Sequence, residues 1–432
     1  MHYFMRSAAV TGVLVAGFLV AGLLVPAPLH GQSLTASDPI IGPEGDAFYE
    51  PPDPLPLGEP GELIWYRETE ELPAGAGRSF QVLYHSRRED GADTTVSGSV
   101  SIPDGSSPPG GWPIESYGHP TTGITDCDAP SLWGGFGPSI PATIDARTDY
   151  EGLGTPGEHT YLVGGALGRN MLDIARAARQ LPGVDAANQV VLRGFSEGGH
   201  AALFAGEQAR SYAPELDVVG VVAAAPAVEL LQLLKTSART PSAIGYAGYA
   251  AWGYSHAYDL SLADVLTPEA IDALTKTADC MGDPPERSIW DFTADEALIR
   301  NPWELPDWQQ RIDQNTPGTR PSIPVWIFAG GKDLVVPVKA INGYVGRACE
   351  QGTHVTLFVH PSGGHEGITD GGLIDEWVDA RRAHEPLGES TCDTDEPPPP
   401  TDRPPGGEEG EPPVVGAAQP ATPTPGTPTF TG

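Results

Sequence analysis

The sequence predicts an α/β fold with a mostly parallel central sheet and an inserted helical cap. Three features of the chain lead to this prediction. Short, continuous apolar runs alternate with helical patterns, as in parallel sheets that helices cover on both faces. Two earlier segments alternate apolar and polar residues, as antiparallel strands do. Residues 227–321 interrupt this order, and they are too many for an ordinary connection between two strands.

The elements can be justified in chain order. Residues 80–85 and 94–102 form the antiparallel pair, and residues 114–117 form a weaker strand. Residues 166–181 carry apolar side chains on one helical stripe, which ends at a Pro-Gly pair. The remaining elements are strands at 190–192, 218–225, 325–328 and 355–359 and helices at 199–212 and 373–383. The cap is rich in aromatic residues, which either form a small core or present a lipid-facing surface.

Both ends of the chain differ in composition from this body. Residues 1–36 contain a long apolar run and are expected to be a secretory signal peptide, with an uncleaved membrane anchor as the alternative. Residues 386–432 are rich in Pro, Thr, Gly and Glu and are expected to be a disordered tail. The body then has two α/β parts, 37–226 and 322–385, around the cap at 227–321. Once the signal peptide is removed, no stable membrane span is expected.

The charge of the chain excludes one class of partner. Its 24 Lys and Arg stand against 57 Asp and Glu, a formal net charge of −33. Nucleic-acid binding needs basic residues to neutralise phosphates, so this class is not expected. Anionic membranes would not attract such a chain electrostatically either. Nothing in the sequence requires a metal or a cofactor.

The cysteines fit an exported protein. Export makes Cys127, Cys280, Cys349 and Cys392 candidates for two disulfides, for which three pairings are possible. None of the four belongs to a C-x-x-C pair, which argues against a zinc ribbon or a thioredoxin-like site.

The segment Gly194-Phe195-Ser196-Glu197-Gly198 matches the G-x-S-x-G pattern. The pattern is weak alone, but here an apolar strand leads into it and a helix leads out of it. In this arrangement the serine sits on a strained turn with its hydroxyl exposed, and side chains at the flanking glycines would collide across the bend. Ser196 is therefore the predicted nucleophile. The alternative is a glycine-rich turn with an idle serine.

A serine nucleophile needs a base, and the base needs a carboxylate to orient it. In proteins with such a turn, the acid and then the histidine follow the serine in loops after late strands. Asp333 lies just after the strand at 325–328, and His365 lies in a Gly-flanked loop after the strand at 355–359. His360 competes with it, but stands at the strand's end. We favour His365 because its loop can reach Ser196.

An oxyanion hole is the third requirement. One donor should be the backbone N–H of Glu197, and the other should come from the loop at 117–123. Pro120 has no N–H, so Thr121 is the first candidate and His119 the second. The side chain of Glu197 is expected to be solvated at the helix start, where the helix dipole favours a carboxylate.

Several motifs together resemble the secretory lipase family, the group typified by Candida antarctica lipase A and its bacterial relatives. The resemblance covers about residues 46–385. The motifs that carry it are Phe48-Tyr49 with Pro51-Pro52, the segment 58–64, His119-Pro120-Thr121-Thr122-Gly123 with Cys127, Asp149-Tyr150-Glu151-Gly152-Leu153-Gly154, and Gly194-Phe195-Ser196-Glu197-Gly198-Gly199.

The resemblance implies an α/β-hydrolase core, a cap over the site, and ester hydrolysis by Ser196, Asp333 and His365. It also implies disulfides between Cys127 and Cys280 and between Cys349 and Cys392. The chain departs from bacterial relatives in two places. Pro120 stands where they tend to have Gly, and Glu115-Ser116 stands where they tend to have an apolar strand. Burying Glu115 unpaired would be costly, so it should be paired, exposed or protonated.

The sequence thus predicts a secreted, monomeric serine ester hydrolase that cleaves acyl esters, with acylglycerols as the first candidate substrates. An acyl-enzyme on Ser196 would be its intermediate. The same three residues acting on a cell-envelope ester or a peptide are the first alternative, because fold and triad do not decide the substrate. A non-catalytic, hydrolase-like surface module is the second.

Overall fold

The computed structural model describes residues 40–70, 72–134, 140–238, 240, 243–280, 287–318, 323–366 and 372–393. These residues belong to one compact unit, 39–432. The predicted signal peptide and most of the predicted tail lie outside them. Among the described helices, none combines the length and the apolar character that crossing a bilayer requires.

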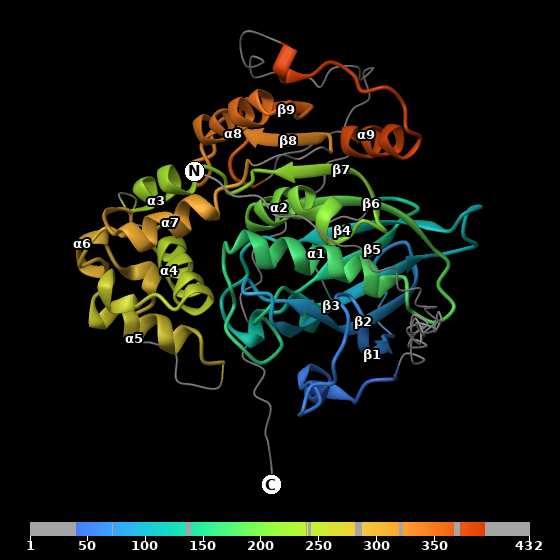
Figure 1. Ribbon diagram of the computed structural model, residues 1–432, viewed down its shortest axis with the longest axis horizontal. Helices are drawn as coiled ribbons and strands as arrows, with labels where there is room; N and C mark the ends of the chain where they lie inside the picture. The colour runs from blue at the N-terminus through green and yellow to red at the C-terminus, as the bar shows by residue number, and fades with distance from the viewer. Residues whose placement is uncertain are drawn as a thin grey trace, which may run out of the picture. The chain divides into compact units, whose positions relative to one another are not determined.

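A nine-stranded sheet organises the described residues, in the order β1-β2-β3-β5-β4-β6-β7-β8-β9 (Figure 1). The first four strands in this order pair antiparallel, and the six from β5 to β9 pair parallel. The strands are β1 (Leu63–Glu68), β2 (Ala76–Arg87), β3 (Asp93–Pro103), β4 (Trp112–Gly118), β5 (Ile144–Thr148), β6 (Ala186–Phe195), β7 (Asp217–Ala224), β8 (Val325–Gly330) and β9 (Val355–His360). The predicted mostly parallel sheet is confirmed.

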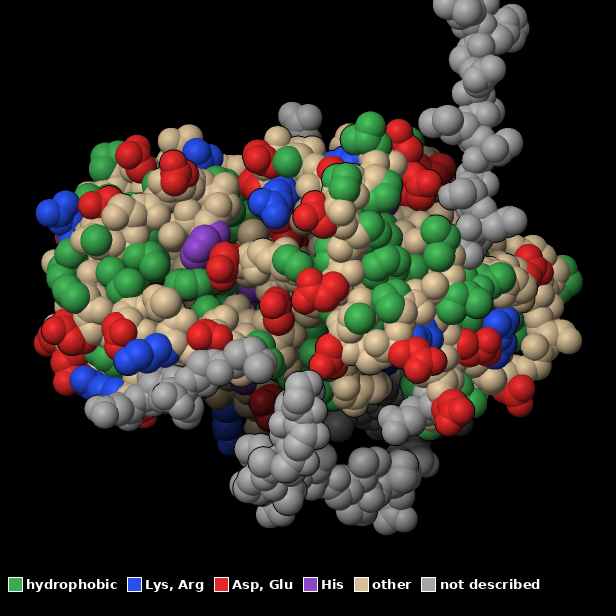
Figure 2. Space-filling view, turned by 90° about the horizontal axis from the view of Figure 1, so that it is seen from below, with side chains coloured by type: hydrophobic (Ala, Val, Ile, Leu, Met, Phe, Trp, Pro, Cys, Tyr) green, Lys and Arg blue, Asp and Glu red, His purple; other side chains and the backbone are tan. Residues whose placement is uncertain are grey.

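Acidic side chains are scattered over one face of this body, among hydrophobic ones, and basic side chains are fewer there (Figure 2). This distribution agrees with the net charge of −33. Such a surface would repel anionic partners and would leave a neutral ligand unaffected.

Helices cover both faces of the parallel part. Val221 of β7 packs in a core cluster with α1 (Gly164–Ala178), α2 (Glu197–Tyr212) and α8 (Val338–Glu350), whereas Val222 packs with α9 (Leu373–Arg382). Successive side chains of a strand point to opposite faces, so α9 lies across the sheet from the other three. Strands buried on both faces need continuous apolar sequences, which is why these runs could be read as strands.

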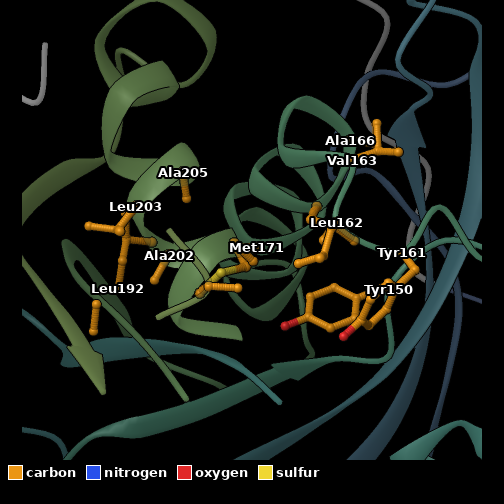
Figure 3. Packing of buried hydrophobic residues seen from close by; sticks show 14 of the residues in the cluster. Tyr150, Tyr161, Leu162, Val163, Ala166, Met171, Leu192, Ala202, Leu203 and Ala205 are labelled. Atoms are coloured by element: carbon orange, nitrogen blue, oxygen red, sulfur yellow. The ribbon is translucent and has the colours of Figure 1, made fainter. Parts of the chain in front are cut away.

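The helices α1 and α2 approach each other closely beside β6. A Cβ atom added at Gly168 would lie 2.7 Å from the backbone nitrogen of Ala205, so only glycine fits there. Figure 3 shows Met171 of α1, Leu192 of β6 and Leu203 of α2 in this common cluster. The close approach fixes α2, which begins at the residue after Ser196.

The inserted segment, 227–321, contributes helices but no strand of the sheet among the residues that the structure describes. Its helices are α3 (Leu230–Ser237), α4 (Ile244–Tyr258), α5 (Pro268–Thr277), α6 (Ala294–Ala297) and α7 (Pro306–Gln314). Tyr249, Trp252, Tyr254 and Trp308 are buried, which favours the interpretation of these aromatics as core. They belong to the same cluster as the residues of α1 and α2.

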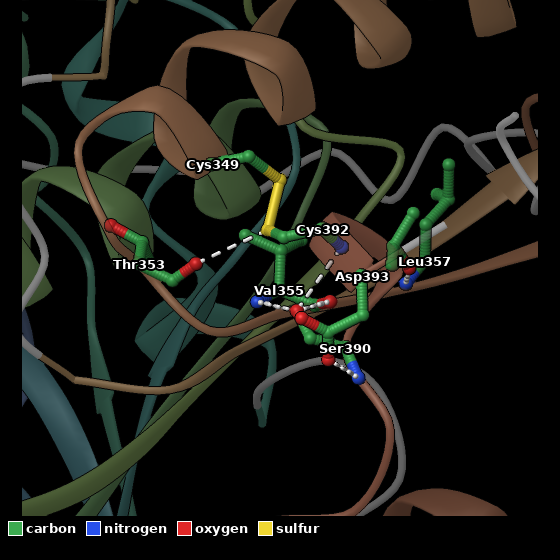
Figure 4. Close-up of a disulfide and its surroundings, with 8 residues drawn as sticks. Cys349, Thr353, Val355, Leu357, Ser390, Cys392 and Asp393 are labelled. Carbon is green, nitrogen blue, oxygen red and sulfur yellow. Dashed lines mark hydrogen bonds between the residues drawn. A yellow bond between two sulfur atoms is a disulfide. The ribbon is translucent and has the colours of Figure 1, made fainter. Parts of the chain in front are cut away.

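The start of the predicted tail needs a correction. The hydroxyl of Ser390 accepts from the N–H of Val355 and donates to its carbonyl, and the N–H of Leu357 donates to the hydroxyl of Thr391 (Figure 4). Because β9 is the last strand of the sheet, its free edge offers these partners. The prediction that the tail begins at residue 386 is therefore wrong, since the chain stays attached to the body through 393.

Candidate active site

The backbone at Ser196 has the sharp geometry that the motif predicts. Ser196 stands between β6 and α2 with φ 57° and ψ −114°, a strained conformation for any residue but glycine. A Cβ atom at Gly194 would lie 2.0 Å from the carbonyl oxygen of Gly198, and one at Gly198 would lie 1.9 Å from that of Gly118. Both positions therefore require glycine, and the bend presents the serine hydroxyl at the end of β6.

The structure joins Ser196, His365 and Asp333 by hydrogen bonds. The Ser196 hydroxyl is 2.9 Å from Nε2 of His365, and Nδ1 of His365 is 2.8 Å from Oδ2 of Asp333. The other carboxylate oxygen of Asp333 accepts from the N–H groups of Val335 and Val336, at 2.8 Å each. Since a carboxylate only accepts, Nδ1 of His365 carries a proton, and Nε2 is left to accept the serine proton.

Backbone contacts bring the acid and the base together. The loops after β8 and β9 touch where the N–H of Lys332 donates to the carbonyl of Gly363, at 2.8 Å. A Cβ at Gly330 would lie 2.1 Å from the carbonyl oxygen of Gly364, so glycine is needed there too. His360, the competing histidine, stays at the end of β9, and its Nδ1 has no hydrogen-bond partner among the described residues.

The predicted oxyanion loop lies against the start of α2. The carbonyl oxygens of Gly118 and His119 face Gly198, as the clash distances of an added Cβ there show. The first backbone bond of the helix runs from the N–H of His200 to the carbonyl of Ser196, so the N–H of Glu197 has no acceptor within the helix. Thr121 follows in the same loop, and its hydroxyl is 2.9 Å from that of Tyr161.

The expectation of a solvated Glu197 side chain is wrong. The residue is 1% exposed, and its Oε1 lies 3.0 Å from Nε2 of His159. Burial opposes a charge on His159, but the hydrogen bond and the charge of Glu197 outweigh it and raise the pKa of His159. Sequence reasoning missed His159 because it stands 38 residues before Glu197, in no recognised spacing.

Glu115 is paired, which is one of the three outcomes expected for it. The residue is fully buried in β4, where Oε1 lies 3.3 Å from Nη1 of Arg193 and Oε2 accepts from the N–H of Ile140 at 2.8 Å. Burial raises the pKa of Glu115, and Arg193 partly offsets that effect. The carboxylate belongs to the sheet rather than to the site.

The cysteines form two disulfides in the pairing that the resemblance implies. Cys127, shortly after the oxyanion loop, is bonded to Cys280, which follows α5 in the inserted segment. Cys349 at the end of α8 is bonded to Cys392 (Figure 4). The first bond links the loop beside the site to the inserted segment, and the second holds the end of the described chain against α8.

Sequence comparisons relate the chain to lipases. A family model described as "Secretory lipase" matches residues 145–390. Lipase 10 of Candida albicans is 24% identical over 399 residues, which are 80% of this chain and 83% of that protein. Lipase A of Moesziomyces aphidis is 28% identical over 211 residues, which are 44% of each chain.

Solved structures share the fold. Candida antarctica lipase A in its closed state has a TM-score of 0.63 at 19% identity, over 77% of this chain and 84% of that one. The rice cell wall degrading esterase LipA from Xanthomonas oryzae has a TM-score of 0.59 at 18% identity, over 76% and 97%. The predicted α/β-hydrolase fold is confirmed.

Proposed function

The chain belongs to the secretory lipase family and is a lipase-like carboxylic ester hydrolase. We propose that it cleaves acyl esters through an acyl-enzyme on Ser196. The observation that carries this proposal is the hydrogen-bonded series of Ser196, His365 and Asp333, with distances of 2.9 and 2.8 Å. Family membership and two disulfides indicate an extracellular protein, because disulfides persist in oxidising compartments.

The proposed reaction has two steps. His365 takes the proton of Ser196 as its oxygen bonds to the ester carbonyl carbon, and the carbonyl oxygen becomes an oxyanion. The N–H of Glu197 and a donor near Thr121 stabilise this oxygen. The intermediate then collapses, and His365 gives its proton to the leaving alcohol. In the second step His365 takes a proton from water, whose oxygen bonds to the acyl carbon. The bond to Ser196 then breaks, the acid leaves, and His365 returns the proton to the Ser196 oxygen.

We propose acylglycerols as the substrate class. The surroundings of the site support apolar acyl chains, because the ring of Phe195 stands 5.1 Å from that of His365 and Leu334, beside Asp333, is 83% exposed. The inserted segment is proposed as the lid, since Tyr161 beside the oxyanion loop packs edge to face on Tyr249 of α4, with centroids 5.8 Å apart. A peptide or cell-envelope ester would be an alternative substrate of the same residues.

Substitution of the serine tests the proposal. Ser196→Ala should lower kcat on p-nitrophenyl esters by more than about 10³-fold, because nucleophile and base act as a unit. Ser211→Ala, an exposed serine of the same helix, is the matched control and should keep full activity. A Ser196→Ala variant that keeps wild-type activity would refute the assignment.

A substrate series separates the alternatives. Acylglycerols of increasing chain length should be cleaved faster than a peptide amide of similar size, and the opposite order would reject the lipase interpretation. Labelling with a fluorophosphonate should occur at Ser196. A folded protein that neither cleaves esters nor takes up this label would instead be a non-catalytic surface module.

A further inference from the structure

Glu197 contributes two groups to the region of the site. Its backbone N–H is the proposed first donor to the oxyanion, and its carboxylate is buried beneath the same turn. Oε2 of that carboxylate is buried without a hydrogen-bond partner among the described residues. A negative charge one residue after the nucleophile would oppose the negative charge that develops on the substrate oxygen. Burying it is also unfavourable unless it is paired.

His159 supplies the opposite charge. Its Nε2 lies 3.0 Å from Oε1 of Glu197, and its Nδ1 lies 3.0 Å from the backbone carbonyl oxygen of Glu151. Both neighbours are acceptors, and an imidazole ring donates from both nitrogens only when it is protonated. The carboxylate of Glu151 is paired with Arg88, whose Nε lies 3.2 Å from it. The positive charge of His159 therefore balances the negative charge of Glu197. His159 is 0% exposed, so solvent does not screen the pair.

The segment that carries His159 also holds the other side of the proposed oxyanion hole. We name residues 149–163 the brace. The hydroxyl of Tyr150 donates to the carbonyl of His119 at 3.1 Å, and the hydroxyl of Tyr161 is hydrogen-bonded to that of Thr121. Figure 3 shows Tyr150 and Tyr161, which belong to the same buried cluster. The ring of His159 lies near both, with its centroid 6.0 Å from the centroid of each tyrosine ring.

We propose that His159 and Glu197 are positioning residues of the oxyanion hole, in which the brace fixes both donor segments and His159 neutralises the Glu197 carboxylate. This inference rests on the proposed function of Ser196. Neither side chain needs to touch the substrate. His159 acts on the first donor through Glu197, and Tyr161 acts on the second through Thr121.

The charge balance gives the inference a specific test. In His159→Gln, a hydrogen bond to Glu197 can persist while the carboxylate loses its counter-charge, so kcat for p-nitrophenyl esters should fall about 30-fold or more, with KM within about threefold. Glu197→Gln removes the negative charge as well, and kcat should fall less than about fivefold. The double variant has a neutral, hydrogen-bonded pair and should recover most of the activity that His159→Gln loses.

The outcomes are distinct. A double variant as impaired as His159→Gln, or more so, would show that the pair is only structural and would overturn the inference. So would a His159→Gln variant with wild-type kcat. Ser196→Ala in the same assay tests the proposed function separately: if that variant is active, the function and this inference both fail. If it is inactive while His159→Gln is fully active, only the inference fails.

A second variant covers the case in which His159→Gln does not fold. Tyr161→Phe removes only the hydroxyl that holds Thr121, and kcat should fall about fivefold to tenfold with KM unchanged. The matched control is Tyr258→Phe, which removes a hydroxyl that accepts from Asn315 in the inserted segment, at 2.8 Å. Its kcat should stay unchanged. A Tyr161→Phe variant with wild-type kcat would overturn the inference.

Discussion

The contact between α2 and the oxyanion loop can be tested by replacing Gly198 with Ala. The added Cβ would lie 1.9 Å from the carbonyl oxygen of Gly118 and 2.8 Å from that of His119. Cβ atoms do not approach other heavy atoms closer than 3.0 Å, and both neighbours are backbone atoms that no rotamer can remove. The helix and the loop must therefore separate by about 1 Å, a displacement that can cost about 100-fold in rate.

We accordingly expect Gly198→Ala to lower kcat on p-nitrophenyl esters about 100-fold, which is about 2.7 kcal/mol of transition-state stabilisation. The strain should also lower the free energy of unfolding by about 1–3 kcal/mol. Urea unfolding monitored by circular dichroism measures the second effect. A Gly198→Ala variant with wild-type kcat would refute the argument that this apposition sets the oxyanion geometry.

The control is Gly346→Ala in α8, where an added Cβ meets no heavy atom within 4 Å. Both glycines lie in helices, Gly198 in the first turn of α2 and Gly346 inside α8, and only at 198 does an added Cβ meet a backbone atom. Gly346→Ala should raise the free energy of unfolding by about 0.5–1 kcal/mol and leave kcat unchanged. An equal loss of kcat in this control would show that the effect at 198 is not due to the contact.

Three further predictions concern stability. Burial lowers the pKa of His200 to about 4. Below about pH 6.5 the unfolded chain binds a proton at this histidine that the folded chain does not bind, so the free energy of unfolding should fall by about 3 kcal/mol between pH 7 and pH 4. In His200→Asn the fall should be smaller. Replacing Cys349 and Cys392, which are separated by 43 residues, with Ala should cost about 4 kcal/mol in thermal unfolding. Asn315→Ala removes the side chain whose Oδ1 accepts from the N–H of Gly164 at 2.9 Å, and should cost about 1–3 kcal/mol in urea unfolding. Unchanged values in the same assays would contradict each prediction.

The parallel strands were predictable because their burial on both faces is encoded locally. The run at 190–192 lies within β6, and that at 325–328 lies within β8. β5 was missed because its sequence contains Asp145 and Arg147. These side chains pair with each other at 2.6 Å and thereby allow a polar sequence inside the sheet. That compensation depends on the folded arrangement, so hydropathy does not reveal it.

The helix α8 was missed for a different reason. Its buried residues Ala340, Ile341, Tyr344 and Ala348 have helical spacing, so the signal was present in the sequence. Two glycines, Gly343 and Gly346, weaken the helical propensity of the segment. The apolar periodicity predicts this helix better than residue propensity does, because burial of one helix face stabilises it by more than two glycines destabilise it.

In the candidate site too, features that the local sequence encodes could be predicted, and features that depend on the folded arrangement could not. The bend at Ser196 could be predicted because glycine is the only residue that fits at positions 194 and 198, and this requirement is written in the sequence. The places of Asp333 and His365 followed from the ends of apolar strands. The environment of Glu197 could not be predicted, since the dipole of a helix start favours a solvated carboxylate as readily as a buried one.

The buried pair changes how the motif itself should be understood. A solvated carboxylate after the serine would be screened by water and salt, and its effect on the oxyanion would be small. A buried one acts through the low dielectric of the interior, where charges interact several times more strongly. The fold therefore has to neutralise Glu197 where it stands, and His159 does so from the segment that also contacts the oxyanion loop. A residue at the centre of the sequence motif thus depends, for its compatibility with catalysis, on a side chain that no motif includes.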